Sequence, residues 1–213
     1  MKIKTGMIAC ILIFMANIAF TQSKDLGFVL GIGIVSHAFT EVDDTREGST
    51  YFNGEDEIEA AAGFQIYAEY FILDYLSLGL KSQALAGGVD YSGTDGKVER
   101  RIMIDNSTFY TNLLFPVGSG YWRLGGSAGA GSSKYTVSWE VICNASSSSC
   151  VDEKIEESTN GSVAEVGFIV DWGEDASGGR LGYVSSSMTH DKIDDTEIKA
   201  SGSQFFVDFR YSW

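Results

Sequence analysis

A serine–histidine combination is the first feature of this chain with residue types suited to catalysis. His190 follows closely after Ser185–Ser187, and a histidine can activate a serine hydroxyl as a nucleophile for hydrolysis. No recognisable hydrolase motif surrounds these residues, and serine and histidine are common at strand ends. We therefore interpret His190 as structural and keep a hydrolytic role as an alternative.

Glycine and cysteine residues suggest two further kinds of chemistry. The segment Gly31–Ser36 begins like a dinucleotide-binding fingerprint, but it lacks the third glycine and no helix follows. Cys143 and Cys150 alone are too few ligands for zinc. In an oxidising compartment these two cysteines are expected to form a disulfide across a short loop. We predict no catalytic residue, no metal site and no cofactor.

Composition narrows the class of protein. The chain has 213 residues, 25 of them glycine and one proline, and 13% are aromatic. This content argues against disorder and allows one barrel or sandwich domain. The net charge of −14 provides no basic patch for phosphates, so we exclude nucleic acid as a partner.

The first 21 residues are typical of a secretory signal peptide. Lys2 and Lys4 precede an apolar run from Met7 to Phe20, which is short for a membrane span. Small residues at Ala19 and Thr21 suit cleavage before Gln22. We predict that residues 1–21 are removed and that residues 22–213 form one barrel domain.

A two-residue period, typical of β-strands, runs through most of the remaining chain. Large apolar side chains occupy one face of each segment, and Gly, Ser or charged residues occupy the other. The seventh segment alternates poorly, so its faces stay unassigned. The eight predicted strands lie near residues 26–35, 62–71, 76–83, 107–115, 122–131, 164–172, 180–189 and 204–213.

The small residues opposite the bulky ones indicate where lipid lies. A soluble barrel buries its bulky face, whereas a transmembrane barrel turns that face to lipid and fills its narrow lumen with small and polar side chains. Short links alternate with long polar ones, near residues 36–61, 87–106, 132–162 and 190–201. We predict a closed eight-stranded antiparallel up-and-down transmembrane β-barrel.

Two segments carry a resemblance to a known group. The alternating C-terminal residues resemble the β-signal read by the outer-membrane assembly machinery: Phe205, Val207, Phe209, Tyr211 and Trp213. Glu69–Leu80 resembles the strand–turn–strand of small eight-stranded bacterial outer-membrane proteins of the OmpA, OmpX and opacity-protein type. The resemblance implies a monomer in the bacterial outer membrane, surrounded by lipid and lipopolysaccharide, with short turns in the periplasm and long loops outside.

Charged residues on the predicted lumen face form the candidate site. Paired, they would plug the lumen, because an unpaired buried charge is costly. The alternative is a narrow gated pore in which re-pairing of Arg123 or Arg210 opens a path. The residues are Glu69, Lys81, Arg123, Glu165, Asp171, Asp208 and Arg210.

The predicted outer loops hold most of the excess negative charge. Glu41–Glu59 alone contains eight acids and one base. A repulsive, solvated surface explains this charge, and divalent cations that bridge to lipopolysaccharide, or a basic surface partner, are the functional alternative. No loop has the complete spacing of an EF-hand.

These observations predict a non-enzymatic barrel that displays acidic loops for surface interactions. A narrow channel for small solutes and a lipid A-modifying enzyme that uses His190 are the alternatives.

Overall fold

The computed structural model describes residues 27–43, 58–92, 96–118, 121–144, 151–174, 177–193 and 196–212. The predicted signal peptide, Cys150, Trp213 and most of the acidic segment Glu41–Glu59 lie outside the described residues. No helix among the described residues is long and apolar enough to cross a membrane. The strands are β1 (Phe28–Asp43), β2 (Ala60–Leu73), β3 (Leu76–Ser92), β4 (Gly96–Val117), β5 (Trp122–Cys143), β6 (Glu153–Glu174), β7 (Ser177–Ile193) and β8 (Thr196–Ser212).

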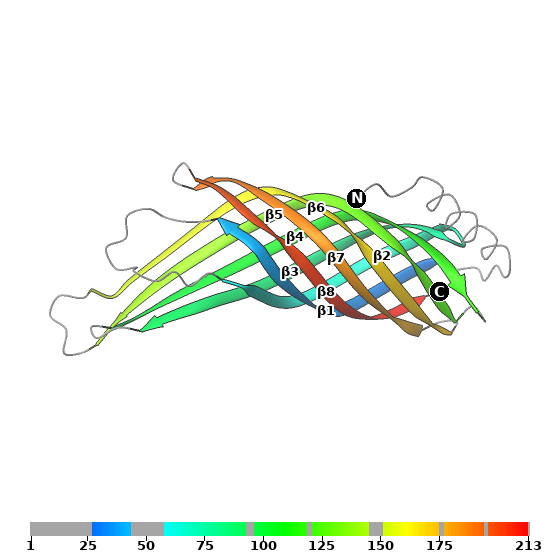
Figure 1. Ribbon diagram of the computed structural model, residues 1–213, viewed down its shortest axis with the longest axis horizontal. Coiled ribbons are helices and arrows are strands. Elements are labelled where there is room, and N and C mark those ends of the chain that lie inside the picture. The colour runs from blue at the N-terminus through cyan, green and yellow to red at the C-terminus, as the bar shows by residue number, and fades with distance from the viewer. Residues whose placement is uncertain are drawn as a thin grey trace, which may run out of the picture.

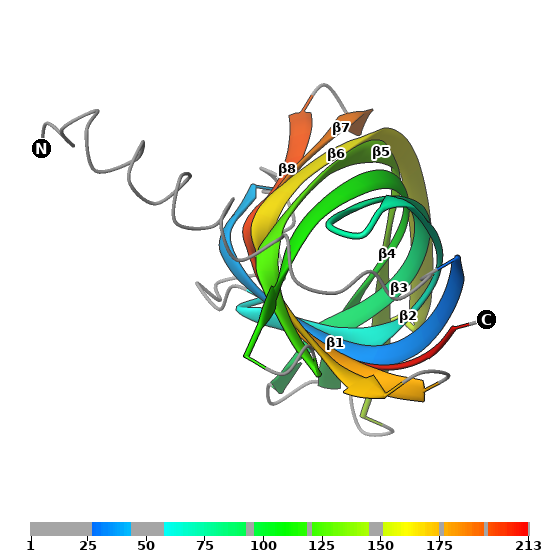
Figure 2. The same cartoon turned by 90° about the vertical axis from the view of Figure 1, so that its right-hand side faces the viewer.

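The strands form a closed ring (Figures 1 and 2). Each strand pairs antiparallel with the next one in sequence, and β1 also pairs with β8, from Val29 opposite Ser212 to Asp43 opposite Lys199. Closure satisfies the backbone groups that an open sheet edge would expose to lipid. The predicted eight-stranded up-and-down barrel is confirmed.

The two ends of the barrel differ in their links. At one end, here called the turn end, Asp74 and Tyr75 join β2 to β3, and β4 ends at a turn in which Gly118 has a φ of +66°. A left-handed φ suits glycine because it has no Cβ. The opposite end, here called the hairpin end, lies at the left in Figure 1.

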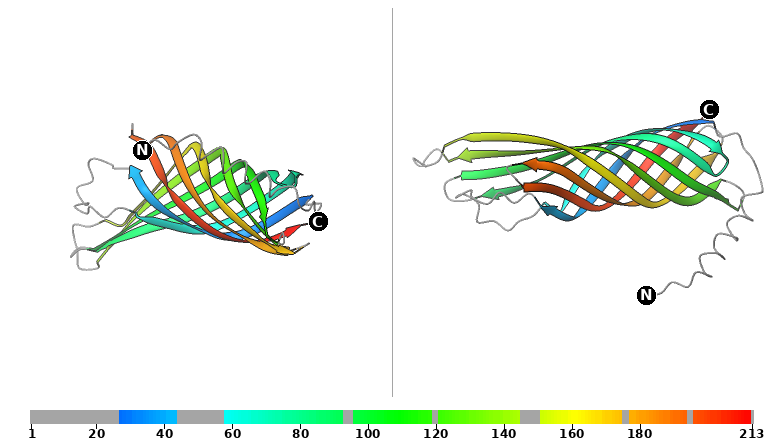
Figure 3. Two further views of the ribbon diagram at one scale, coloured as in Figure 1. Left: turned by 45° about the vertical axis from the view of Figure 1, so that its right-hand side comes forward. Right: turned by 90° about the horizontal axis from the view of Figure 1, so that it is seen from above.

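Two of the predicted long loops, 87–106 and 132–162, are for the most part strand, and this part of the prediction was wrong. Most of the predicted loop 36–61 lies outside the described residues. β4, β5 and β6 have 22 residues each, so most of 87–106 and 132–162 is hydrogen-bonded ladder. Figure 3 shows the far ends of β5 and β6 reaching beyond β7 and β8 at the hairpin end. The lengths of these loops were overestimated because the two-residue alternation continues there, with the apolar side chains on the inner face and the polar ones on the outer face.

Near the turn end, the outer wall is apolar, and the lumen holds charged and amide side chains among apolar ones such as Phe71 and Leu114. We call this the membrane region. Ile66, Leu80 and Phe109 are 56%, 63% and 54% exposed on the outer wall, whereas Gln65 and Asn112 are buried inside. The predicted outer faces of β1, β2, β3, β4, β5, β6 and β8 therefore have the predicted orientation.

Near the hairpin end, the polarity is reversed, and we call this the protruding region. Its interior is a packed apolar core, while Arg101, Asp105 and Lys134 face outward. The core includes Leu85, Ile102, Ile104, Tyr135, Val137, Val163, Met188, Ile198 and Ala200.

Glycines in the lumen make room for aromatic rings of the neighbouring strand. A Cβ on Gly31 would collide with the ring of Tyr67, and a Cβ on Gly79 would collide with the ring of Tyr110. The high glycine content therefore allows large side chains to fill a narrow barrel.

Candidate functional site

Arg180 lies at the centre of a charged cluster inside the membrane region. Its guanidinium donates from Nε to Asp171 Oδ1 at 2.6 Å and from Nη2 to Asp171 Oδ2 at 3.1 Å. On the other side, Nη1 donates to Glu69 Oε2 at 2.7 Å and Nη2 donates to Glu69 Oε1 at 3.1 Å. The Arg180 side chain is 3% exposed. A buried arginine that pairs bidentately with two carboxylates clamps β2, β6 and β7 together.

Glu69 receives further donors from β4. Tyr110 Oη and Asn112 Nδ2 each donate to Glu69 Oε2 at 3.0 Å. The guanidinium of Arg180 also lies over the ring of Tyr67, 4.8 Å from its centroid. Because the carboxylate is fully buried, these bonds replace those it would make with water.

Two more arginines lie toward the turn end of this cluster. Arg210 Nε is 3.8 Å from Asp171 Oδ2, and its Nη2 donates weakly to the Trp172 carbonyl at 3.5 Å. Arg123 stacks over Phe71 at 5.1 Å from the ring centroid, and its Nη1 has no hydrogen-bond partner among the described residues. Arg180 therefore makes the close pairs, and Arg123 and Arg210 are peripheral.

The remaining predicted lumen charges lie nearer the middle of the barrel. Lys81 Nζ pairs with Glu165 Oε2 at 2.6 Å across the lumen, and both side chains are buried. Asp208 Oδ1 accepts from Gln65 Nε2 at 2.7 Å, and Gln65 Oε1 accepts from Gln83 Nε2 at 2.8 Å. A chain of side-chain amides thus continues the network toward the hairpin end.

Arg180 is not among the lumen charges predicted from the sequence, because β7 alternates poorly. A usable signal was the short link between β6 and β7, which places Arg180 directly opposite Asp171. Residues opposite one another in an antiparallel pair share a face, so Arg180 belongs inside with Asp171.

Side chains fill the described part of the lumen. A cavity of about 20 Å³ lies beside Tyr67, Arg180 and Asp208, which is room for about one water molecule. Above it, the apolar core of the protruding region contains Leu85 and Ile104, which are 1% and 0% exposed. A charged layer and an apolar layer therefore both obstruct passage.

The proposed serine–histidine combination does not form. Ser185 and Ser187 face outward, whereas His190 faces inward, where its Nε2 lies 2.8 Å from Ser133 Oγ of β5. Ser133 and His190 are 3% and 2% exposed, so both side chains are enclosed in the barrel. Ser186 also faces inward, but it lies four residues from His190 along the extended strand. No group of three potential metal ligands occurs among the described residues.

The outer surface of the protruding region carries an ion network between β3 and β4. Asp90 pairs with Arg101 Nη1 at 2.6 Å and with Lys97 Nζ at 3.0 Å. Glu99 joins both bases, at 2.6 Å from Lys97 and 3.0 Å from Arg101. Hydrogen bonds from Arg101 and Lys97 lower the pKa of Asp90.

The protruding region also has an unpaired strand edge among the described elements. β6 pairs with β7 only from Gly161 onward, opposite His190, whereas its preceding residues, 153–160, pair only with β5. Thr159 Oγ1 donates to the Asp191 carbonyl at 3.0 Å, which is a side-chain contact only. The backbone groups of alternate residues in this segment therefore point to a side on which no strand is paired among the described residues.

Cys143 is the last residue of β5, and its backbone N–H donates to Asp152 Oδ1 at 2.8 Å. Asp152 precedes β6, so this bond ties together the two ends of the β5–β6 link. Because Cys150 lies outside the described residues, the disulfide stays a prediction.

Solved structures of bacterial outer-membrane proteins are similar to this chain. The outer membrane protein OprG from Pseudomonas aeruginosa shares 13% identity and a TM-score of 0.51, covering 89% of this chain and 97% of OprG. The attachment invasion locus protein Ail of Yersinia pestis shares 13% identity and a TM-score of 0.46, covering 88% and 99%. The outer membrane protease OmpT from Escherichia coli shares 9% identity and a TM-score of 0.42, covering 92% and 100%. No protein-family model and no curated protein matches the sequence.

At 13% identity, the likeness to OprG concerns the fold, and fold alone does not decide activity. It agrees with the closed ring and with the apolar outer wall of the membrane region. The chain has the architecture of the small bacterial outer-membrane β-barrel proteins, as the resemblance in its sequence predicted.

Proposed function

We propose that this chain is a non-enzymatic, monomeric outer-membrane anchor that holds an acidic β-sheet above the membrane to bind a basic, extended partner. The turn end faces the periplasm and the protruding region faces outward. The observation that carries this proposal is the unpaired edge of β6 at residues 153–160.

The edge offers two kinds of attraction. An extended segment of a partner can add to the sheet through backbone hydrogen bonds, which is a recurrent mode of recognition. The segment also exposes two acids, Glu153 and Glu156, against one base, Lys154, and this charge favours a cationic partner and speeds its approach.

The barrel beneath supports this role as an anchor. Arg180, Glu69 and Asp171 join three strands, and the side chains that fill the lumen make the wall rigid. We infer that the plugged lumen carries no solute flux. Planar-bilayer recordings of the purified barrel are expected to show no discrete conductance steps. Steps that change in Arg180→Ala or Arg123→Ala would replace the anchor with the channel alternative.

A peptide-binding experiment tests the surface role. The barrel in detergent is titrated with an extended peptide of alternating lysine and threonine, and with its glutamate–threonine counterpart. We expect the lysine peptide to bind, with affinity falling as salt rises, and the glutamate peptide not to bind.

Two matched variants locate the binding surface. Glu156→Lys changes a charge on the edge strand, whereas Glu140→Lys makes the same change on β5, which is paired on both sides. Glu156→Lys is expected to weaken binding of the lysine peptide about tenfold, which corresponds to about 1.4 kcal/mol, and Glu140→Lys by less. Equal losses, or equal binding of both peptides, contradict the edge as the site.

A further inference from the structure

The two faces of the sheet next to the β6 edge differ in character. On the inner face, Trp139 of β5 lies opposite Ile155 of β6, and both side chains are half-buried. On the outer face, Ser138 lies opposite Glu156, and the Glu156 side chain is exposed. A strand that adds to this edge therefore meets apolar side chains on its inner side and a carboxylate on its outer side.

The last residues of β7 show which side chains fit next to β6. Met188 pairs with Val163 on the inner face, and both side chains are buried in the apolar core. Thr189 pairs with Ser162 on the outer face, and both side chains are exposed. In the part of the chain that the structure describes, this pairing does not reach residues 153–160. A partner strand would therefore continue the sheet in the place that β7 leaves.

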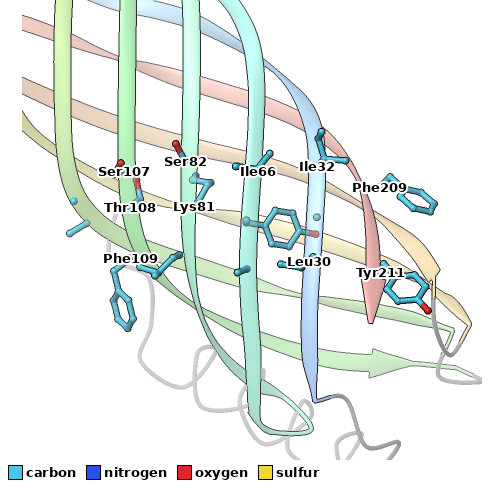
Figure 4. Close-up of a pocket in the computed structure, with 16 residues that line it drawn as sticks. Leu30, Ile32, Ile66, Lys81, Ser82, Ser107, Thr108, Phe109, Phe209 and Tyr211 are labelled. Carbon is cyan, nitrogen blue, oxygen red and sulfur yellow. The ribbon is translucent and has the colours of Figure 1, made fainter. Parts of the chain in front are cut away.

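The surroundings decide which face of a partner strand is apolar. Figure 4 shows the membrane region, where large apolar side chains such as Ile32, Phe109 and Phe209 lie on the outer wall, as lipid requires. Residues 153–160 belong to the ends of β5 and β6 that reach beyond β7 and β8 (Figure 3). In water, apolar side chains are favoured on the inner face. A partner strand in this place must therefore turn its apolar side chains inward.

We propose that the β6 edge selects a strand in which an apolar residue packs inward beside Ile155 and Trp139, and the next residue is basic and lies outward beside Glu156. Neighbouring residues of a strand point to opposite faces, so an apolar and a basic residue adjacent in sequence make both contacts. Glu157 shares the inner face with Ile155, but it is half-buried and already interacts within the chain. The exposed Glu156 is therefore the carboxylate that a base meets. This inference rests on the proposed function and adds the side-chain pattern of the partner to it.

An alternating lysine–valine peptide tests the inward contact. It is titrated onto the whole barrel in detergent and compared with the alternating lysine–threonine peptide of the same length and charge. Only the side chains on the face away from the lysines differ between the two. We expect the valine peptide to bind about fivefold more tightly. Equal affinities overturn the apolar contact and leave the proposed function standing, whereas binding of neither peptide overturns both.

Variants test each contact on its own face of the sheet. Ile155→Thr is expected to remove most of the gain from valine. Ile142→Thr makes the same change on the outer face of β5, where Ile142 is 42% exposed, and is expected to leave the gain unchanged. Glu156→Gln should weaken both peptides more than Glu157→Gln does, because the lysines lie outward. A gain that persists in Ile155→Thr, or the reverse order of the two glutamates, overturns the pattern. A shift in gel migration on heating checks that each variant has folded.

Discussion

Along β4, one uninterrupted strand meets two opposite environments. In the membrane region, Phe109 and Leu113 face outward while Asn112 faces the lumen. In the protruding region of the same strand, Ile102 and Ile104 face inward. β5 makes the same exchange, since Ala130 faces outward near the turn end and Tyr135 faces inward near the hairpin end.

The exchange shows that the surroundings decide which face is apolar. In lipid, the outer face must be apolar and the interior is held by ion pairs and amide hydrogen bonds. In water, burial of apolar side chains stabilises the interior and the outer face is charged. The register of the β3–β4, β4–β5 and β5–β6 ladders does not change at the boundary, so each of these ladders continues from one kind of core into the other.

Removing the centre of the charged core should have the largest effect. Arg180→Met leaves Glu69 and Asp171 buried without their partner and is expected to cost about 3–5 kcal/mol in unfolding free energy. Urea unfolding in detergent micelles measures this loss of unfolding free energy. Arg101→Met removes two exposed ion pairs, which water and salt screen, and its cost should be clearly smaller. Similar losses in both variants contradict the distinction between the two regions.

Neutralising the carboxylates should rescue the first variant. In a triple variant with Glu69→Gln, Asp171→Asn and Arg180→Met, no uncompensated charge remains. Its unfolding free energy is expected to lie above that of Arg180→Met alone. A triple variant as unstable as Arg180→Met would show that lost packing, and not unpaired charge, causes the damage.

The apolar core of the protruding region is tested by the same truncation at two isoleucines. Ile104→Ala removes a fully buried side chain in water-surrounded structure and is expected to cost about 2–5 kcal/mol. Ile66→Ala shortens a side chain that faces lipid, where no hydrophobic driving force is lost, and should cost clearly less. The free energies of unfolding of both variants are measured in the same micelles. Equal losses would contradict an apolar core that is stabilised by water around the protruding region.

An arginine introduced on the outer wall tests where the boundary between the membrane region and the protruding region lies. Ile66 and Met103 are both about half exposed on the outer wall, at 56% and 50%. Ile66→Arg places a charge in hydrocarbon and is expected to cost about 2–4 kcal/mol. Met103→Arg is in water and should change stability by about 0.5 kcal/mol or less. A large cost at Met103 would move the membrane boundary toward the hairpin end.

The smallest effect concerns pH at the outer surface of the protruding region. The hydrogen bonds from Arg101 and Lys97 lower the pKa of Asp90 in the folded protein, so their contribution is present above the unfolded carboxyl pKa of about 4. It is lost as pH falls through the lower, folded pKa. The protection factor of the amides near Ser92 and Gly96, which is the intrinsic exchange rate divided by the observed one at the same pH, should fall below about pH 4 in the wild type. Asp90→Asn should show no such step, and a step in both would assign it to another group.

The sequence predicted the outer faces of seven strands because, in each, the alternation persists over several residues within one environment. It failed for β7, where the outer face changes from Leu181 and Tyr183 to Ser185 and Ser187 within one segment. The inner face changes at the same level, from Arg180 to Met188. A strand that crosses the membrane boundary within a few residues has its apolar residues on the outer face in one half and on the inner face in the other. Its outward face therefore cannot be assigned from the sequence.

Most charged members of the candidate site were predictable from the sequence, but its central residue, Arg180, and the pairing of the charges were not. The seven predicted charges were placed on the lumen face by strand periodicity. Which carboxylate meets which base depends on the tilt of the strands around the ring, and this brings Lys81 of β3 to Glu165 of β6. Sequence spacing alone contains no information on such a contact across the lumen.

The ladder between β1 and β8 has a consequence for how the protein is made. Val29 pairs with Ser212, so the first strand to leave the ribosome waits for the last before its free side is covered. Contacts this remote in sequence form slowly, and the waiting strands expose edges prone to aggregation. Synthesis that stops before β8 would leave β1 without the strand that covers its free side, so the ring would stay open.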